Sequence, residues 1–250
     1  MAEPSTAYRR VPGWAGVAAA GAALGVLTGT ALVVLAVVAG PGPGLTGYVS
    51  EAGVAESEYA WPYRIGVFSL ATALFLLALA LRAESRSPGL TRVEQPGVAT
   101  VQRLAGHRGV ALLRQVASLG GAVVLLVVGG LTTLLSGAVT CSAGCPLPPF
   151  EPATVADLVH GGASVAATAA VVFAMIAVAL APQVDQRLRR PATIAAMVAL
   201  PLAVSVAAAM LFVGRGSLVG VLERLVLAVI VVWGLTTALT LASARRPERS

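Results

Sequence analysis

Hydrophobic residues fall into six long runs along this 250-residue chain, separated by polar or turn-forming segments. An α-helix rises 1.5 Å per residue, so about 20 apolar residues are enough to cross the hydrocarbon core of a bilayer. Each run has that length and therefore predicts a membrane-spanning helix. We expect these helices at residues 14–38, 62–81, 116–135, 155–180, 192–213 and 221–241.

The composition supports the same architecture. Of all residues, 57% are hydrophobic and only 11% are charged, whereas soluble domains carry about 25% charged residues. The predicted fold class is therefore an all-α integral membrane protein, a single six-helix bundle over residues 14–241 between short tails at 1–13 and 242–250. Residues 98–115 mix apolar and basic positions and are expected to form an amphipathic helix on the membrane surface.

The distribution of arginine predicts the orientation in the membrane. The chain has 17 basic residues, all of them arginine, and 14 lie in the two tails, in the second-to-third loop and in the fourth-to-fifth loop. Basic residues accumulate on the cytoplasmic side of membrane proteins. Both termini are therefore predicted to be cytoplasmic, and the loop with the cysteines exoplasmic.

The same arginine content bears on source and partners. Arginine without lysine, together with abundant Ala, Gly and Val, is typical of a GC-rich bacterial genome, so we expect the plasma membrane of a bacterium. The net charge of +6 follows from the cytoplasmic loops, and no nucleic-acid partner is expected. Membrane lipid is the expected partner.

One face of the first helix is smooth. Gly21, Gly25 and Gly29 recur every four residues and so lie on one face, where small residues let helices approach closely. The stripe predicts close contact with another helix, and through this face the chain is expected to bind a membrane-protein partner or a second copy as a homo-oligomer.

Ionisable residues gather where the second, fourth and sixth helices begin. Three positive helix-dipole ends meet there, and charged residues at a membrane boundary are candidates for function. The candidates are Glu51, Arg64, Asp157, His160, Arg215, Glu223 and Arg224. The three arginines predict a site for an anionic lipid headgroup. The alternative is interhelical ion pairs, such as Arg224 with Glu51 or Glu223 with Arg64.

The start of the fourth helix carries two of these candidates. Thr154 and Asp157 have the spacing of a capping box. Asp157 and His160 are three residues apart on one helical face, where they can form a hydrogen bond. A carboxylate that holds a histidine is typical of a metal site or of a general base with its orienting partner. The alternative is that this pair only fixes the packing of the helix.

The two cysteines, Cys141 and Cys145, lie in the preceding loop. In an exoplasmic loop they predict a structural disulfide. The string CSAGCP also resembles the Cys-x-x-x-Cys-Pro pattern of Sco-type copper chaperones, in which soft thiolates and a histidine hold copper; His160 would be that histidine. Those proteins have a thioredoxin fold, which a six-helix bundle lacks.

Three short motifs resemble a known family. They are YVSEAG (residues 48–53), the D-x-x-H of Asp157 and His160, and LER (residues 222–224) with Trp233 beyond it. Together, over residues 14–241, they resemble a prokaryotic family catalogued as domain of unknown function 998. The chain is more distantly similar to the DRAM/Frag/Sfk group of eukaryotic six-span proteins. The resemblance implies a six-helix membrane bundle, and for the eukaryotic relatives it implies links to lipid organisation or trafficking. It supplies no catalytic residues that could be carried over, and no cofactor is expected.

The leading functional hypothesis is a non-enzymatic membrane protein that binds or organises lipid at its outer rim. The alternative is a small-solute transporter or intramembrane enzyme that uses Glu51, Asp157, His160 and Glu223 in a cavity, and a third hypothesis is copper handling. The chain contains no P-loop, dinucleotide fingerprint, HExxH or G-x-S-x-G motif in a suitable context, so an enzyme is the less favoured reading.

Overall fold

The computed structural model describes residues 13–40, 44, 47–85 and 118–243, so both tails and the predicted surface helix at 98–115 lie outside the described residues. Within them the chain is helical and has no strand. All six long helices are long and apolar enough to cross a membrane, which confirms the predicted fold class. They are α1 (Gly13–Ala39), α2 (Ala60–Ser85), α4 (Leu119–Ala138), α5 (Val155–Leu180), α6 (Gln186–Phe212) and α7 (Ser217–Ser243), with a short 3₁₀ helix, η2 (Val49–Gly53), between α1 and α2.

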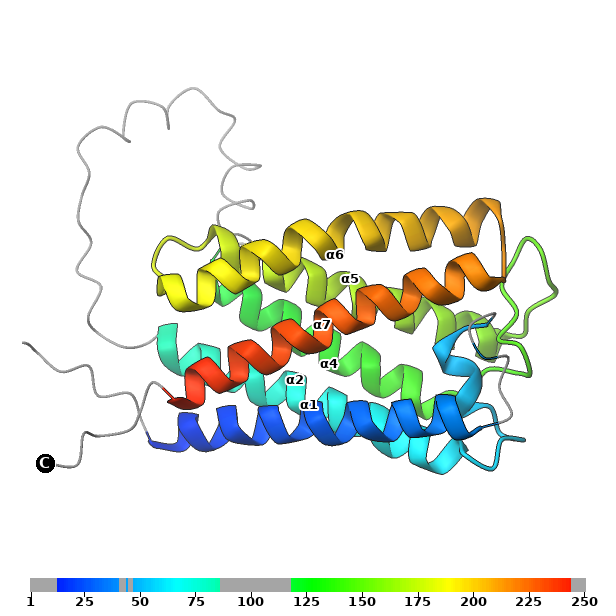
Figure 1. Ribbon diagram of the computed structural model, residues 1–250, viewed down its shortest axis with the longest axis horizontal. Helices are drawn as coiled ribbons and strands as arrows, with labels where there is room; N and C mark the ends of the chain where they lie inside the picture. The colour runs from blue at the N-terminus through cyan, green and yellow to red at the C-terminus, as the bar shows by residue number, and fades with distance from the viewer. Residues whose placement is uncertain (1–12, 41–43, 45–46, 86–117, 244–250) are drawn as a thin grey trace, which may run out of the picture.

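The six helices form a closed ring in chain order (Figure 1). Each packs against the helices before and after it, and α7 returns to pack against α1. Gly13 and Ser243 therefore lie at one end of the bundle, called here the terminal end. The opposite end, called here the cysteine-loop end, carries η2, the α4–α5 loop and the α6–α7 turn.

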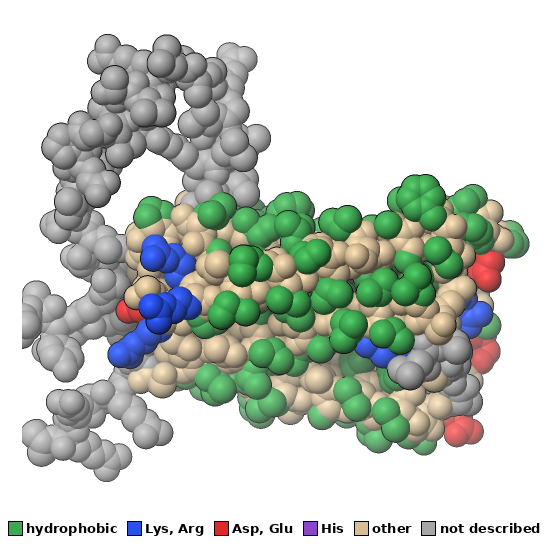
Figure 2. Space-filling model, turned by 45° about the horizontal axis from the view of Figure 1, so that its top comes forward, with side chains coloured by type: hydrophobic (Ala, Val, Ile, Leu, Met, Phe, Trp, Pro, Cys, Tyr) green, Lys and Arg blue, Asp and Glu red, His purple; other side chains and the backbone are tan. Residues whose placement is uncertain are grey.

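The surface of the bundle is apolar along the helices and charged at the ends. Large apolar side chains such as Val17 and Phe212 are exposed, which is costly in water but not in lipid. On the face in Figure 2, arginines gather at the terminal end and carboxylates at the cysteine-loop end. These features are those of a multi-pass membrane protein.

Small residues let the helices approach closely. The main core is rich in alanine, and its largest fully buried side chains include Leu77, Leu126, Met175, Val178 and Trp233. Burial of such side chains against one another supplies dispersion contacts that lipid tails do not match in density.

The glycine stripe of α1 packs against α2 of the same chain. A β-carbon on Gly25 would lie 3.1 Å from the Ser69 carbonyl oxygen, and one on Gly29 would lie 2.8 Å from that of Gly66. The Ser69 hydroxyl donates to the Gly25 carbonyl oxygen at 3.1 Å. The stripe is therefore used within the chain, and a second copy would need another face.

Helix α6 begins six residues earlier than the hydrophobic run that predicts it. The Asp185 side chain accepts a hydrogen bond from the Arg187 backbone N–H at 2.8 Å and so caps the helix. Leu188 is buried, and arginine is a good helix former. The polar first turns therefore extend the helix beyond its apolar segment.

The close approach of α1 and α2 at Gly29 and Gly66 predicts the effect of one substitution. In Gly66→Val the new β-carbon would lie 2.9 Å from the Gly29 carbonyl oxygen. We expect the free energy of unfolding in detergent to fall by about 1–3 kcal/mol, the usual cost of overpacking. Gly162→Val is the matched control, because nothing lies within 4 Å of a β-carbon there. Equal effects of the two substitutions would contradict the close packing.

Candidate functional site

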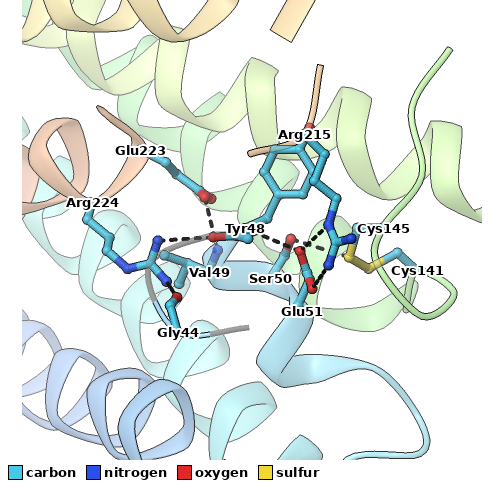
Figure 3. A network of polar contacts seen from close by, with 11 residues as sticks. Gly44, Tyr48, Val49, Ser50, Glu51, Cys141, Cys145, Arg215, Glu223 and Arg224 are labelled. Atoms are coloured by element: carbon cyan, nitrogen blue, oxygen red, sulfur yellow. Dashed lines mark hydrogen bonds and ion pairs between the residues drawn. A yellow bond between two sulfur atoms is a disulfide. The ribbon is translucent and has the colours of Figure 1, made fainter. Parts of the chain in front are cut away.

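Glu51 of η2 is the buried partner of an ion pair with Arg215, which is partly exposed (Figure 3). Nε and Nη2 of Arg215 donate to Oε1 and Oε2 of Glu51 at 2.9 and 2.6 Å. The Tyr48 backbone N–H also donates to Oε1 at 2.9 Å. Glu51 is only 7% exposed, so a bidentate partner is needed to offset its desolvation. The hydrogen bond to Glu51 raises the pKa of Arg215 above its ordinary value.

Two adjacent residues of α7 hold the backbone that leads into η2. Oε2 of Glu223 accepts a hydrogen bond from the Val49 N–H at 2.9 Å. Nη1 of Arg224 donates to the carbonyl oxygens of Gly47 at 3.0 Å and Gly220 at 2.7 Å. Its Nη2 donates to the Gly44 carbonyl oxygen. The carboxylate of Glu223 thus binds a backbone N–H of this segment, and the guanidinium of Arg224 binds its carbonyl oxygens.

The phenol of Tyr48 is enclosed by these groups. Burial raises the pKa of Tyr48 above its ordinary value, and the negative charge of Glu223 adds to this effect. Tyr48 packs with the two cysteines and Val219. It therefore serves as a neutral apolar body between η2 and the cysteine loop.

The ion pairs suggested by the sequence differ from those that form. Glu51 pairs with Arg215 rather than with Arg224, because the α6–α7 turn carries Arg215 over η2. Glu223 binds backbone rather than Arg64. Within the described residues, Nε of Arg64 is buried and has no hydrogen-bond partner.

Asp157 fastens the cysteine loop to α5. Its carboxylate accepts hydrogen bonds from the backbone N–H groups of Ser142 and Thr154 at 2.7 and 2.8 Å. Both hydroxyl groups donate to it as well, at 2.8 and 2.7 Å. The Thr154 hydroxyl accepts from the Asp157 N–H, which completes the predicted capping box. Every oxygen of this buried carboxylate is thereby satisfied.

His160 binds backbone and not Asp157, which corrects the predicted hydrogen bond between the two side chains. Its Nδ1 lies 2.9 Å from the Ser136 carbonyl oxygen and 2.8 Å from that of Val139. The carboxylate of Asp157 is already filled by the loop. His160 is 4% exposed, and its Nε2 is buried without a partner in the described part of the chain.

The cysteines are joined as predicted. A disulfide connects Cys141 and Cys145, and both are buried. The Ser50 hydroxyl of η2 donates to Sγ of Cys145 at 3.4 Å. This contact joins the network around η2 to the one around the cysteine loop.

The predicted residues therefore fall into three groups. Glu51, Arg215, Glu223 and Arg224 hold η2, while Asp157 and His160 hold the cysteine loop and Arg64 belongs to neither network. Sequence reasoning missed Ser50 and Ser142, because a serine in a loop gives no signal of its partner.

The comparisons with known proteins found a family match over the second half of the chain. A model of the family described as "Protein of unknown function (DUF998)" matches residues 97–240, more than half of the 250 residues. The chain belongs to this family. No curated protein and no solved structure matches the chain.

The DUF998 match is narrower than the whole-chain resemblance expected from the sequence. It includes Asp157, His160, Glu223 and Arg224, but the YVSEAG segment at 48–53 lies before it. The DUF998 region thus supplies side chains that bind η2, while η2 itself lies outside the match.

The ion pair of Glu51 and Arg215 predicts a specific loss of stability. Arg215→Gln leaves a buried carboxylate without its cation, so we expect the free energy of unfolding to fall by about 2 kcal/mol or more. The double variant with Glu51→Gln should recover part of this loss in a double-mutant cycle. Glu56→Gln is the control, since Glu56 is exposed. Additive single effects would contradict the pairing.

Proposed function

We propose that this protein is a non-enzymatic component of a bacterial plasma membrane that binds an anionic lipid headgroup at its outer-leaflet rim. Arg64 is the residue that binds the headgroup phosphate. The proposal assumes the orientation that the arginine distribution predicts, with both termini in the cytoplasm.

The observation that carries the proposal is the unused hydrogen-bonding capacity of Arg64. A guanidinium has five N–H donors. Nε of this one is buried without a partner among the described residues, but the residue as a whole is only half-buried, so its other N–H groups are the ones that would meet a headgroup. An unpaired buried donor is costly. By contrast, Arg215 donates hydrogen bonds to Glu51, and Arg224 donates to backbone carbonyl oxygens.

The surroundings of Arg64 support a lipid as its partner. It lies near the start of α2, whose first turn contains no acidic residue. Trp61 and Ile65 beside it in the sequence are 71% and 53% exposed. An interfacial tryptophan and an exposed aliphatic residue suit the boundary between headgroups and acyl chains. Arginine binds phosphate through paired N–H donors.

The carboxylates of the outer rim hold the protein backbone in place and are not free for chemistry. Glu51, Asp157 and Glu223 each accept hydrogen bonds from protein donors. A general base or a transport site needs a carboxylate that meets substrate or water. The lipid-binding hypothesis is therefore favoured over a transporter or an enzyme.

Loss of the Arg64 charge should remove the bound lipid. A charge-assisted hydrogen bond contributes about 1.5–3 kcal/mol, so Arg64→Gln should reduce occupancy by an anionic phospholipid about tenfold or more. The measurement is native mass spectrometry of protein purified in detergent and titrated with phosphatidylglycerol, with phosphatidylcholine as the neutral comparison.

Two variants control for unspecific effects. Arg82→Gln removes the same charge from the other end of α2, where Arg82 is exposed in the last turn, and should leave the outer-rim occupancy unchanged. Arg215→Gln should lower stability and leave lipid bound. Equal occupancy in wild type and Arg64→Gln, or equal losses in Arg64→Gln and Arg82→Gln, would refute the site.

A further inference from the structure

Three soft or borderline metal ligands converge in the cysteine loop. The Sγ atoms of Cys141 and Cys145 and a ring nitrogen of His160 lie within 4.8 Å of one another, and all three residues are buried. Metal bonds to sulfur and nitrogen measure about 2.0–2.3 Å. All three atoms could therefore bind a common ion once the disulfide is opened and the side chains adjust.

The hydrogen bonds of His160 leave one ring nitrogen free to bind a metal ion. Carbonyl oxygens only accept hydrogen bonds, so Nδ1, which contacts two of them at 2.9 and 2.8 Å, carries the proton. In the neutral ring Nε2 then carries a lone pair. That atom is buried and has no partner within the described chain. Metal-binding histidines generally donate their other N–H to such a carbonyl oxygen or carboxylate.

We propose that the dithiol form of Cys141 and Cys145 binds one Cu(I) ion together with Nε2 of His160. Thiolates select soft Cu(I), which accepts few ligands, whereas structural zinc takes four. The nearest carboxylate of the loop, Asp157, is filled by Ser142 and Thr154. Three ligands in a buried pocket therefore suit Cu(I) better than zinc.

The loop holds the two cysteines close together without the disulfide. Gly144 and Cys145 have positive φ angles of 83° and 45°, and the Cys145 N–H donates to the Ser142 carbonyl oxygen at 2.9 Å. None of these contacts involves the S–S bond, so we expect the turn and the hydrogen bonds of Asp157 to remain after reduction. The disulfide is thus the form that cannot bind the ion, and the dithiol is the form that can.

The conversion between the two forms balances with a dithiol reductant. The reductant passes two electrons and two protons to the disulfide, so the S–S bond breaks, two thiols form, and the reductant becomes a cyclic disulfide. Binding of Cu(I) then releases the thiol protons to solvent. No change in the oxidation state of copper is required.

Two neighbours would stabilise the thiolates. The Ser50 hydroxyl donates to Sγ of Cys145 at 3.4 Å. A β-carbon on Gly144 would lie 3.6 Å from Cζ of Arg215, so a guanidinium lies beside the turn. Outer groups of this kind typically change metal affinity 10–100-fold, and Ser50→Ala should weaken binding within that range.

The test is competition for Cu(I) with bicinchoninate. The full chain in detergent is reduced with dithiothreitol, desalted without oxygen and added to the coloured copper complex. Reduced wild type should remove one equivalent of Cu(I) per chain, and the oxidised protein should remove none. X-ray absorption of the loaded protein should show two sulfur ligands and one nitrogen ligand.

Ligand variants separate this site from unspecific thiol binding. Cys141→Ser should lose stoichiometric binding. His160→Asn retains an amide N–H where Nδ1 donates but has no atom in place of Nε2, so it should fold and bind more weakly. If the cysteine variant does not fold, N-ethylmaleimide on the reduced wild type replaces it and should block binding.

The outcomes decide the proposal. Binding by the oxidised protein, absence of binding by the reduced protein, or wild-type affinity in His160→Asn would each overturn it. Arg64→Gln should bind Cu(I) normally, so failure of the lipid site and failure of the copper site are distinguishable.

Discussion

The cysteine-loop end depends on one constraint, which is that buried backbone N–H groups need acceptors. The η2 segment turns back between the helices, where little water is available to its amides. Glu51 and Glu223 supply acceptors to the N–H groups of Tyr48 and Val49. Carboxylates in such a place need compensation themselves, and Arg215 provides it for Glu51. The charges of this end are therefore mainly the consequence of a buried irregular segment.

A second network, in the cysteine loop, also supplies a carboxylate as the acceptor for backbone N–H groups. Asp157 satisfies the start of α5 and the backbone of Ser142 with one carboxylate. The two networks meet where Ser50 contacts Cys145. Among the described residues of this end, two buried side-chain nitrogens have no hydrogen-bond partner, Nε of Arg64 and Nε2 of His160, and these define where ligands are proposed. The first belongs to a residue near the start of α2, and the second to a residue of α5 whose ring contacts the end of α4.

The family match covers only part of the helix ring. The matched residues 97–240 include α4 to α7 apart from the last residues of α7. They contribute Glu223 and Arg224, which bind the backbone of the earlier loop. The closed ring likewise needs α1 and α2 to join α4 and α7. The matched region and the segment before it thus pack into one ring of helices.

The amino-acid sequence by itself determined the helices and the composition of the cysteine-loop end. Hydrophobic runs of about 20 residues leave few alternatives in a membrane, and the capping box of Thr154 and Asp157 and the disulfide are local features that spacing reveals. Only the tertiary structure decided that Glu51 pairs with Arg215 and that His160 turns to the Ser136 carbonyl oxygen. Several cations and acceptors lie at this end, and sequence distance does not rank them. Their choice depends on the rotation of each helix and the path of each loop, which the packing of the whole ring sets.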